Sequence, residues 1–542
     1  MKKSLIWAFA ALAFAACSNP DMNGNDAPVH SGEIEESYIA INLSASDITR
    51  ADEASFEDGT EAERRVSHAD FFFFDEGGNP FNVTGNPATT PGGGSNHLRA
   101  TEVTFREDNT VNGDDISDTS TPVLLLKTYK GQYPSQIVAV LNWSPSNNKA
   151  YTLDELHDAV AIQGSFKNAN DEDTNYFVMS NAVYAQGSTE VRATSLTIEN
   201  IKTSEVDALA APVNIYVERV AAKVSVLAEE KYALNEGNTV YAKILNWDLY
   251  RDNSQSKLLK DIDAVNWTSD NLGFNWNDSP WYRSYWATSL AVTNGEIFDN
   301  EKALRAGQYT YIGENTTGKA TCTKAVIKAQ LVQLVNGEDM PLEIAIWNNV
   351  EYVGNEALRT AVANTLKNTY FAMTEENSTK KYTGLKPEDL KCVAGDINGV
   401  KANEVYFQLS EIGKGKNWYK LENGVYKPVA TDTANDNNSF KATNEALKSV
   451  PSAVLYTDGY TFYYVDIKHL GAQGKAGEYG IVRNHAYNIT IKSITGYGSP
   501  VYTGTEFIDY PQISDQNTFV SAKINILSWR LVNQSVDIKP GN

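Results

Sequence analysis

The side chains that most often carry chemistry are scattered in this sequence. Its six histidines do not occur in pairs at metal-ligand spacing. None of the motifs G-x-S-x-G, H-E-x-x-H, G-x-x-x-x-G-K-[ST] or C-x-x-C is present. The 68 acidic residues are too numerous for a catalytic carboxylate pair to be inferred from the sequence. We therefore expect no catalytic residues, no metal site and no cofactor, and the chain is not predicted to be an enzyme.

Three local patterns have both a functional and a structural interpretation. Residues 108–113 (DNTVNG) resemble a calcium loop, but position twelve is Thr119 rather than Glu, so a solvated acidic loop fits better. Residues 413–416 (GKGK) lack the spacing of a phosphate loop and favour a turn. The cluster of Trp281, Tyr282, Tyr285 and Trp286 could bind a sugar, although packing of a loop against a sheet is the commoner use.

The start of the chain has the pattern of a bacterial export signal. A charged start precedes an apolar stretch, residues 5–16, which is too short to cross a bilayer. Small residues lie directly before Cys17, as in a lipobox, although Phe14 replaces the usual aliphatic residue. Lipidation of Cys17 is therefore expected, and the alternative is a simple secretory signal with a chance cysteine.

The composition indicates a large, β-rich protein. A chain of 542 residues exceeds one typical core, so two or more domains are expected. Short runs of Thr, Val, Ile and Tyr between Gly, Asn and Asp favour strands. The net charge of −22 argues against a nucleic-acid partner and suits a soluble secreted protein. Cys322 and Cys392 could form a disulfide or remain two buried free thiols.

Each end of the chain carries an alternating strand. Near the N-terminus, residues 38–43 place Ile39, Ile41 and Leu43 on one face. The polar residues 44–64 follow, and in them the bond between Arg50 and Ala51 is a natural proteolytic site, with 64–65 as a second candidate. The first strand and the rest of the fold are therefore joined by a cleavable connection.

Near the C-terminus, residues 518–538 alternate again, with a bend near Ser528. The preceding residues 496–517 have little periodicity and could reach roughly 70 Å at about 3.3 Å each. A hydrophobic strand on a long tether can pair with its own domain or with another molecule. Its apolar residues are Val520, Ala522, Ile524, Ile526, Trp529, Val532 and Val536.

Between these ends the pattern predicts many strands and two helices, at residues 152–162 and 355–367. The strongest strand signal is VNIYVERVAAKVSVL at 213–227, where we place a domain boundary. Adjacent Glu218 and Arg219 point to opposite faces of a strand, so we do not expect them to pair with each other. The other predicted strands are 66–74, 123–129, 137–141, 176–185, 196–198, 239–250, 308–314, 325–335, 405–409, 454–467 and 481–494.

Several segments resemble the fimbrillins of the Bacteroidales type V pilus, in the major-subunit group of the short (minor) fimbriae. They span nearly the whole chain beyond the export signal, while residues 85–120 and 250–280 match nothing in that family. The segments are 177–184, 213–224, 282–287, 313–316, 326–332, 480–494 and the C-terminal strand with Leu527, Ser528 and Trp529.

The resemblance implies an all-β fold with few short helices: two transthyretin-like β-sandwich domains and a C-terminal donor strand. Such subunits are exported as outer-membrane lipoproteins and cut after an Arg that follows the first strand, here between Arg50 and Ala51. The cut displaces the strand with Ile39, Ile41 and Leu43, and a neighbour's C-terminal strand fills the groove. The implied divisions are 1–16 (signal peptide), 17–50 (lipidated propeptide), 51–216 and 217–516 (the two sandwich domains) and 517–542 (donor strand).

The resemblance also implies a function, namely a structural shaft subunit of a cell-surface fimbria, extracellular in its mature form. The implied partners are other copies of the chain in a head-to-tail polymer, other pilus subunits, a lipid anchor on the precursor, and a host or bacterial surface ligand. The alternatives are an accessory, tip or anchor subunit of the same pilus, or a surface lipoprotein that binds or hydrolyses glycans through the aromatic residues of 274–287.

Overall fold

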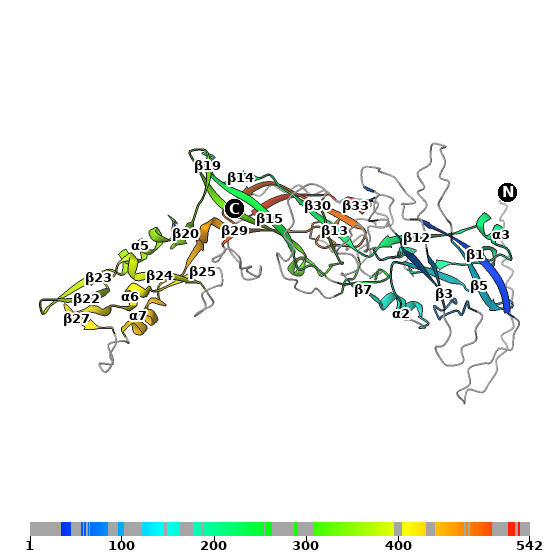
Figure 1. Cartoon of the computed structure of the whole chain (residues 1–542), viewed down its shortest axis with the longest axis horizontal. Coiled ribbons are helices and arrows are strands. Elements are labelled where there is room, and N and C mark those ends of the chain that lie inside the picture. Colours follow the sequence, from blue (N-terminus) through cyan, green and yellow to red (C-terminus); the bar gives the residue numbers. More distant parts are fainter. Residues whose placement is uncertain are drawn as a thin grey trace, which may run out of the picture.

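In its described residues, the computed structural model consists mostly of strands in several sheets with few short helices, which confirms the predicted fold class. The elements fall into three parts along an elongated molecule (Figure 1). The structure describes residues 34–44, 56–57, 59–60, 63, 66–84, 96–101, 122–145, 149–162, 177–186, 189–253, 255–262, 287–290, 308–394, 404–429, 439–470, 473–474, 477–500, 519–525 and 529–531.

The first part is built on an eight-stranded sheet near the N-terminus, with two short helices, α2 (Leu153–Asp158) and α3 (Glu205–Ala210). Two small ladders accompany it: β9 (Tyr184–Gln186) with β10 (Thr189–Val191), and β7 (Val160–Ile162) with β16 (Gln255–Lys257). The sheet runs in the order β4 (His97–Thr101), β3 (His68–Phe74), β6 (Gln136–Leu141), β8 (Met179–Asn181), β12 (Val213–Arg219), β1 (Ile34–Ser44) and β5 (Val123–Tyr129), with β11 (Thr194–Ser195) on β6.

Both faces of this sheet are covered around β3. Phe71 and Phe73 lie in the core that also holds β1, while Phe72 and Phe74 pack on the opposite face with Leu156 of α2. All four phenylalanines are fully buried. The four consecutive apolar residues are therefore explained by a strand with a core on each side rather than by a half-buried strand.

The second part is a sandwich of two six-stranded sheets around Trp247, Tyr463 and Tyr487. One sheet runs β17 (Thr310–Ile312), β13 (Ala222–Leu227), β30 (His485–Thr495), β33 (Trp529–Leu531) and β2 (Phe56–Glu57), with β32 (Phe519–Asn525) also on β30. The other runs β14 (Lys231–Ala233), β15 (Val240–Tyr250), β18 (Lys324–Val335), β29 (Tyr460–Asp466) and β31 (Ser499–Pro500), with β19 (Glu338–Pro341) on β18.

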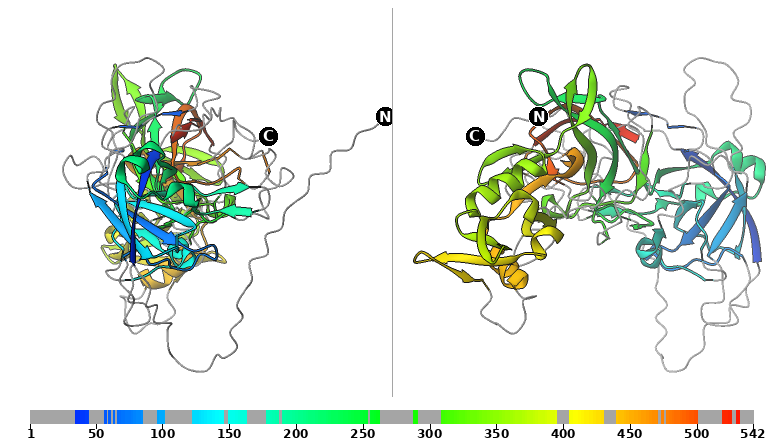
Figure 2. Two further views of the ribbon diagram at one scale, coloured as in Figure 1. Left: turned by 90° about the vertical axis from the view of Figure 1, so that its right-hand side faces the viewer. Right: turned by 60° about the vertical axis from the view of Figure 1, so that its left-hand side comes forward.

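The third part, residues 344–456, is inserted between β19 and β29 and has a core of its own. It projects as a separate body at one end of the molecule (Figures 1 and 2). It contains two sheets and the helices α5 (Asn355–Leu366), α6 (Glu411–Lys414) and α7 (Ser439–Leu447). One sheet runs in the order β21 (Val350–Val353), β20 (Ile344–Trp347), β28 (Ala453–Tyr456), β25 (Glu404–Leu409) and β24 (Leu390–Ala394). The other runs in the order β23 (Thr379–Gly384), β22 (Tyr370–Glu376), β26 (Asn417–Glu422) and β27 (Val425–Pro428).

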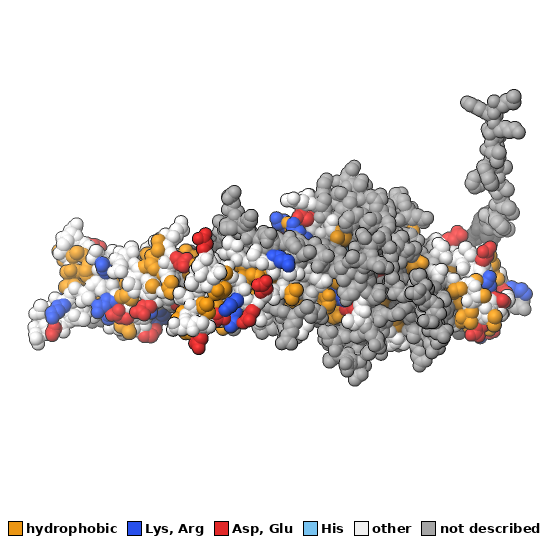
Figure 3. Space-filling model, turned by 90° about the horizontal axis from the view of Figure 1, so that it is seen from above, with side chains coloured by type: hydrophobic (Ala, Val, Ile, Leu, Met, Phe, Trp, Pro, Cys, Tyr) orange, Lys and Arg blue, Asp and Glu red, His pale blue; other side chains and the backbone are white. Residues whose placement is uncertain are grey.

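This insertion differs from the single sandwich expected for residues 217–516, because that stretch contains two separate cores. On the face shown in Figure 3, acidic and basic side chains are intermixed over the inserted part, and hydrophobic side chains lie among them. None of the helices in the described part of the chain has the length and apolar character needed to cross a membrane.

Several predicted elements are shorter, interrupted or replaced in the structure. The predicted strand 176–185 is divided into β8 and β9, and 454–467 is divided into β28 and β29, which belong to different sheets. The predicted helix 152–162 ends at Asp158, because Ala159 is extended and the next residues form β7. It starts where expected, since Thr152 and Glu155 form a capping box. The predicted strand 213–227 breaks after Arg219, and its two halves, β12 and β13, join different sheets. In place of the predicted strand 196–198, residues 198–200 form a 3₁₀ turn.

Candidate functional site

The predicted first strand is an internal strand of the N-terminal sheet. β1 pairs antiparallel with β5 from Ile34 to Ala40, and parallel with β12 from Ile41 to Ser44. The side chains of Ile39 and Ile41 are completely buried in the N-terminal core. Leu43 continues the strand in register with Ile215 of β12. A sheet that lost β1 would therefore have an apolar slot with a free strand edge on each side.

Apolar burial and backbone hydrogen bonds hold β1, and charge contributes little. Tyr38 and Lys202 exchange two backbone hydrogen bonds of 2.7 and 2.9 Å. The ion pair between Glu36 and Lys127 is 2.9 Å long, but about half of each side chain is exposed, and such surface pairs contribute about 0–1 kcal/mol. Burial of each isoleucine is worth about 1.5–3 kcal/mol. An apolar strand of matching register could therefore replace β1.

The chain between the predicted cut and the folded core is fixed at Glu63. Arg50 and Ala51 themselves, like Cys17, lie outside the described residues. The Glu63 carboxylate is buried and accepts hydrogen bonds from Lys223 Nζ at 2.9 and 3.1 Å and from the Tyr311 hydroxyl at 2.8 Å. Arg219 Nε donates to the carbonyl oxygen of Glu63 at 2.9 Å. The strands β12, β13 and β17 thus hold Glu63 where the first and second parts of the molecule meet.

Glu63 and Lys223 form a buried ion pair, and both side chains are at most 1% exposed. Burial raises the pKa of Glu63, but the charge and hydrogen bond of Lys223 outweigh burial and hold the pKa below its ordinary value of 4.5. The carboxylate is therefore charged at neutral pH. Removing one partner of such a pair leaves a buried charge without its counterion and typically costs about 3–5 kcal/mol.

The C-terminal strand pairs with the sheet of its own chain. β32 runs antiparallel to β30, from Thr495 paired with Phe519 to Asn488 paired with Asn525. Val520, Ala522 and Ile524 of the predicted donor strand belong to this ladder. Trp529 lies in β33, and Ile526, Val532 and Val536 lie outside the described residues.

β33 is held much less extensively than β32. It pairs with β30 at two positions and with β2 at two more, where Phe56 lies opposite Arg530 and Glu57 opposite Trp529. β2 lies six residues beyond Arg50. The structure therefore brings the segment that follows the predicted cut against the C-terminal strand.

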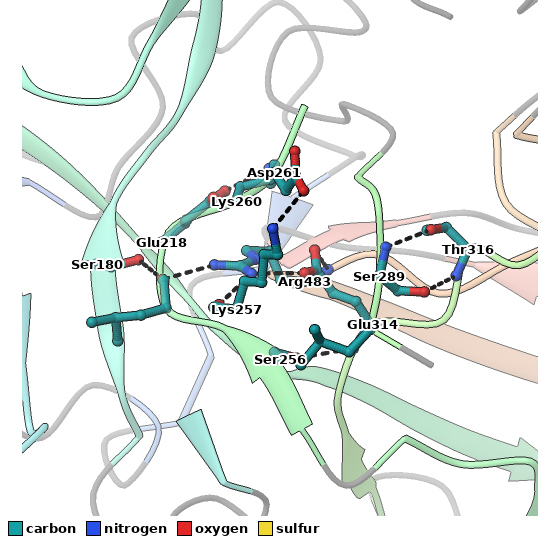
Figure 4. Close-up of polar contacts among 12 residues, drawn as sticks. Ser180, Glu218, Ser256, Lys257, Lys260, Asp261, Ser289, Glu314, Thr316 and Arg483 are labelled. Atoms are coloured by element: carbon teal, nitrogen blue, oxygen red, sulfur yellow. Dashed lines mark hydrogen bonds and ion pairs between the residues drawn. The ribbon is translucent and has the colours of Figure 1, made fainter. Parts of the chain in front are cut away.

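Two further buried ion pairs lie where the two sandwiches meet (Figure 4). Lys260 Nζ donates to Glu218 at 2.8 Å, and the side chains of both are at most 3% exposed. Arg483 pairs with Glu314 at 2.7 Å and donates to the carbonyl oxygen of Leu258 at 3.0 Å. Residues 257–260 therefore connect β12 of the first part with the segment that precedes β30 of the second.

These pairs confirm that Glu218 does not pair with its neighbour Arg219. Glu218 binds Lys260, while Arg219 binds the backbone of Glu63 and the side chain of Asn484 at 3.2 Å. The partners lie 42, 156 and 265 residues away along the chain. Sequence reasoning could not find them, because a strand pattern gives the face of a residue but not what lies opposite.

The remaining candidate residues have structural roles where the structure describes them. His68 is bonded to the Ser67 hydroxyl at 2.8 Å and to the Trp143 carbonyl oxygen at 2.9 Å, so both of its ring nitrogens have a partner within the fold. The rings of His469 and His485 lie 5.0 Å apart, a pairing that their spacing in sequence did not predict. Residues 108–113 and the aromatic residues of 281–286 lie outside the described part.

Cys322 and Cys392 are buried thiols that are not joined in a disulfide, which decides between the two alternatives left open by the sequence. Burial raises the pKa of each thiol to about 12. The run 413–416 forms the end of α6 and its cap, and the carbonyl oxygen of Gly413 accepts a hydrogen bond from Trp418 at 2.8 Å. Gly413 therefore contributes to packing.

Comparison with protein families places the C-terminal strands in a known family. Residues 454–535 match the family described as major fimbrial subunit protein type IV, fimbrillin, C-terminal. The match begins in β28 and extends to just beyond β33, and it contains two of the segments on which the fimbrillin resemblance was predicted. The resemblance is thereby confirmed for this part of the chain. A search of curated proteins finds no match.

Solved structures of low sequence identity extend over most of the chain. One is a proposed cell adhesion protein from Parabacteroides distasonis (11% identity, 93% of this chain and 98% of that one, TM-score 0.36). A fimbrilin from Porphyromonas gingivalis has 14% identity, covers 92% and 98%, and has a TM-score of 0.35. The tip fimbrial protein of Porphyromonas gingivalis, with a C-terminal truncation, has 12% identity, covers 92% and 100%, and has a TM-score of 0.32.

Proposed function

We propose that this chain is a structural shaft subunit of a cell-surface fimbria, and that it polymerises by strand exchange after residues 1–50 are removed. The observation that carries the proposal is the position of β1. It is an internal, apolar strand, and the cleavable stretch with Arg50 separates it from the rest of the fold. The family match of residues 454–535 supports the fimbrial assignment.

The slot left by β1 specifies what can fill it. The incoming strand must run antiparallel to β5 and parallel to β12, because those are the directions of β1. It must also place an apolar side chain at every second position, where Ile39 and Ile41 now lie. Burial of five or six apolar side chains would contribute on the order of 10 kcal/mol before the cost of ordering the strand.

The C-terminal end supplies the candidate donor. In an extended strand its residues Ile526, Val532 and Val536 share one face, whereas Trp529 lies on the other. β32 forms seven residue pairs with β30, so we assign Val520, Ala522 and Ile524 to a resident strand of the chain's own sheet. The donor would then be residues 526–542, which contain the apolar residues Ile526, Trp529, Val532 and Val536. Because β1 and β33 belong to different sheets, a contact between the slot of one chain and the donor of another would be head-to-tail and would extend without closing.

Export and processing complete the proposal. The precursor would reach the outer membrane as a lipoprotein anchored at Cys17, and a protease would cut between Arg50 and Ala51. Release of residues 17–50 would remove the lipid anchor and β1 in one step. The buried anchor at Glu63 would hold the new N-terminal segment on the fold after the cut.

A peptide competition experiment tests the strand exchange. A chain that starts at Ala51 is expected to polymerise, and an added peptide of residues 34–44 is expected to stop it by refilling the slot. The matched control is the same peptide with Ile39→Asp and Ile41→Asp, which should have no effect because both positions are fully buried. Equal inhibition by both peptides, or by neither, would contradict the role of β1.

The position in the fimbria is tested by N-terminal and intact-mass analysis of protein sheared from the cell surface. A chain that starts at Ala51 in high-mass polymer indicates a shaft subunit. A lipidated Cys17 start in a membrane-bound monomer indicates an anchor subunit, and monomeric processed chains at filament ends indicate a tip or accessory subunit.

A further inference from the structure

A cluster of metal-ligating side chains lies on segments other than β1 and the C-terminal strands. It consists of His157 at the end of α2, Glu190 in β10 and Asp261 shortly after β16. A ring nitrogen of the histidine and one oxygen of each carboxylate all lie within 4.8 Å of one another. We propose that these three side chains bind a divalent transition-metal ion, with Zn²⁺ as the ion that fits best.

His157 has a nitrogen that is unsatisfied in the absence of such an ion. The residue is 5% exposed, and its Nδ1 lies 3.3 Å from the Asp158 carboxylate. Its Nε2 is buried and has no hydrogen-bond partner within the described part of the chain. A buried polar atom without a partner is costly and uncommon in native structures. A metal ion bound at Nε2 would satisfy it, since imidazole nitrogen is the commonest protein ligand for such ions.

The two carboxylates are paired with cations that have other acidic partners. Glu190 accepts from Arg192 at 2.8 Å, but Arg192 also pairs with Asp154 at 2.9 Å. Asp261 accepts from a lysine at 2.7 Å, and that lysine, Lys257, also lies 3.3 Å from Asp158. Each cation therefore keeps a counterion when the metal takes Glu190 and Asp261.

The charges around the cluster match a doubly charged ion. The ion-paired groups just described comprise four carboxylates and two cations, so the cluster carries two negative charges in excess. The side chains of Glu190 and Asp261 are 15% and 25% exposed, which gives an ion a route from solvent. A divalent cation would neutralise the excess without burying a new unpaired charge.

The donor atoms favour Zn²⁺ over Ca²⁺ or Mg²⁺. One imidazole nitrogen with two carboxylate oxygens is a ligand set typical of zinc, whereas calcium and magnesium prefer oxygen ligands alone. Zinc bonds of about 2.0–2.2 Å require donors closer together than 4.8 Å, so the three side chains must draw together on binding. Water would complete the coordination. The ion would then connect α2, β10 and the 255–262 segment, which come from distant parts of the sequence.

The test is calorimetric titration of the full chain, without an affinity tag, with Zn²⁺, and with Ca²⁺ and Mg²⁺ for comparison. We expect one saturable zinc site, whose affinity for Zn²⁺ falls at least tenfold in His157→Gln and in Asp261→Asn. The control variant Glu422→Gln changes an exposed carboxylate on the inserted part and should leave the affinity unchanged. Zinc is expected to raise the thermal unfolding midpoint of the wild-type chain and not that of the His157 variant.

Three results would overturn the proposal: no saturable zinc binding by the wild-type chain, equal affinity in the His157 and Asp261 variants, or tighter binding of Ca²⁺ than of Zn²⁺. Circular dichroism reports whether each variant is folded. If His157→Gln does not fold, the partly exposed Asp261 provides the same test with less disturbance of the core.

Discussion

Replacement of the buried isoleucines of β1 by alanine measures how much the first strand contributes to the fold. Ile39 and Ile41 are both completely buried in the core of the N-terminal sheet. A buried Ile→Ala change costs about 2–5 kcal/mol. Because the two side chains share one core, their effects need not add, and we expect the double variant of the unprocessed chain to lose about 4–8 kcal/mol. That is a large fraction of the 5–15 kcal/mol typical of a native domain.

The assay is urea unfolding of the unprocessed chain, followed by a signal from the N-terminal part. The control is Glu36→Ala on the same strand, whose exposed ion pair with Lys127 should contribute less than about 1 kcal/mol. If the double variant is too unstable to purify, Ile41→Val, expected to cost about 0.5–1.5 kcal/mol, gives the same test at lower amplitude. A double variant as stable as the control would refute the reasoning, because β1 would not belong to the core.

Three further outcomes follow from the described contacts. Deletion of residues 526–542 should leave a folded monomer that forms no filaments in electron micrographs, whereas deletion of 518–542 should also lower the unfolding midpoint, because it removes β32 from its sheet. Glu63→Gln should cost about 3–5 kcal/mol at pH 7, because it removes the carboxylate that forms a buried ion pair with Lys223. Since the pKa of Glu63 is lowered in the fold, its stabilising contribution is present above pH 4.5 and lost as the pH falls through the lowered value, so unfolding curves of wild type and variant should converge in acid. In a chain starting at Ala51, Cys322 and Cys392 should resist a thiol reagent at pH 8 and react after unfolding, because both are buried and have a pKa of about 12.

Elements with a regular apolar period were predicted closely. The strand 123–129 has the predicted limits, and α5 ends one residue before its prediction. In both, local pattern and tertiary burial agree. The strand 213–227 shows where local pattern is insufficient. Its two halves have the same apolar character, and only their partners divide them between two sheets. The first half, β12, pairs with β8 and β1, whereas the second half, β13, pairs with β17 and β30.

The inserted part was missed as a separate body, although local turn signals occur just before it and within it. Asn336 and Gly337 both have positive φ and join β18 to β19 just before the insertion, and Asn423 and Gly424 do the same between β26 and β27. Asn-Gly at such turns is a strong hairpin signal. It indicates the two strands it joins but not the core they belong to. The separate core of residues 345–455 depends on which strands meet in space.

The buried isoleucines of β1 could be predicted from the sequence, whereas the partners of the buried charged residues could not. The period of two at residues 38–43 predicted that Ile39 and Ile41 are buried, but it did not predict that Ala40 on the other face is buried as well. Glu63 and Lys223 are 160 residues apart, and nothing in either local sequence indicates that the other is its partner. The metal-ligand cluster was hidden for the same reason, since its three residues come from a helix end, a strand and a loop.

The contact between β2 and β33 links processing to assembly in the proposed mechanism. β2 begins six residues after Arg50, and β33 is the first described strand of the proposed donor. Before the cut, the chain is held by the fold on both sides of β2. β1 holds it on the N-terminal side and Glu63 holds it on the C-terminal side. The cut separates β2 from β1, so β2 is then held along the chain only by Glu63. With four residue pairs in total, β33 then depends on a partner that has become a free chain end. Fraying of that end would release the donor only after the same chain's slot has begun to open, which disfavours filament growth from unprocessed subunits.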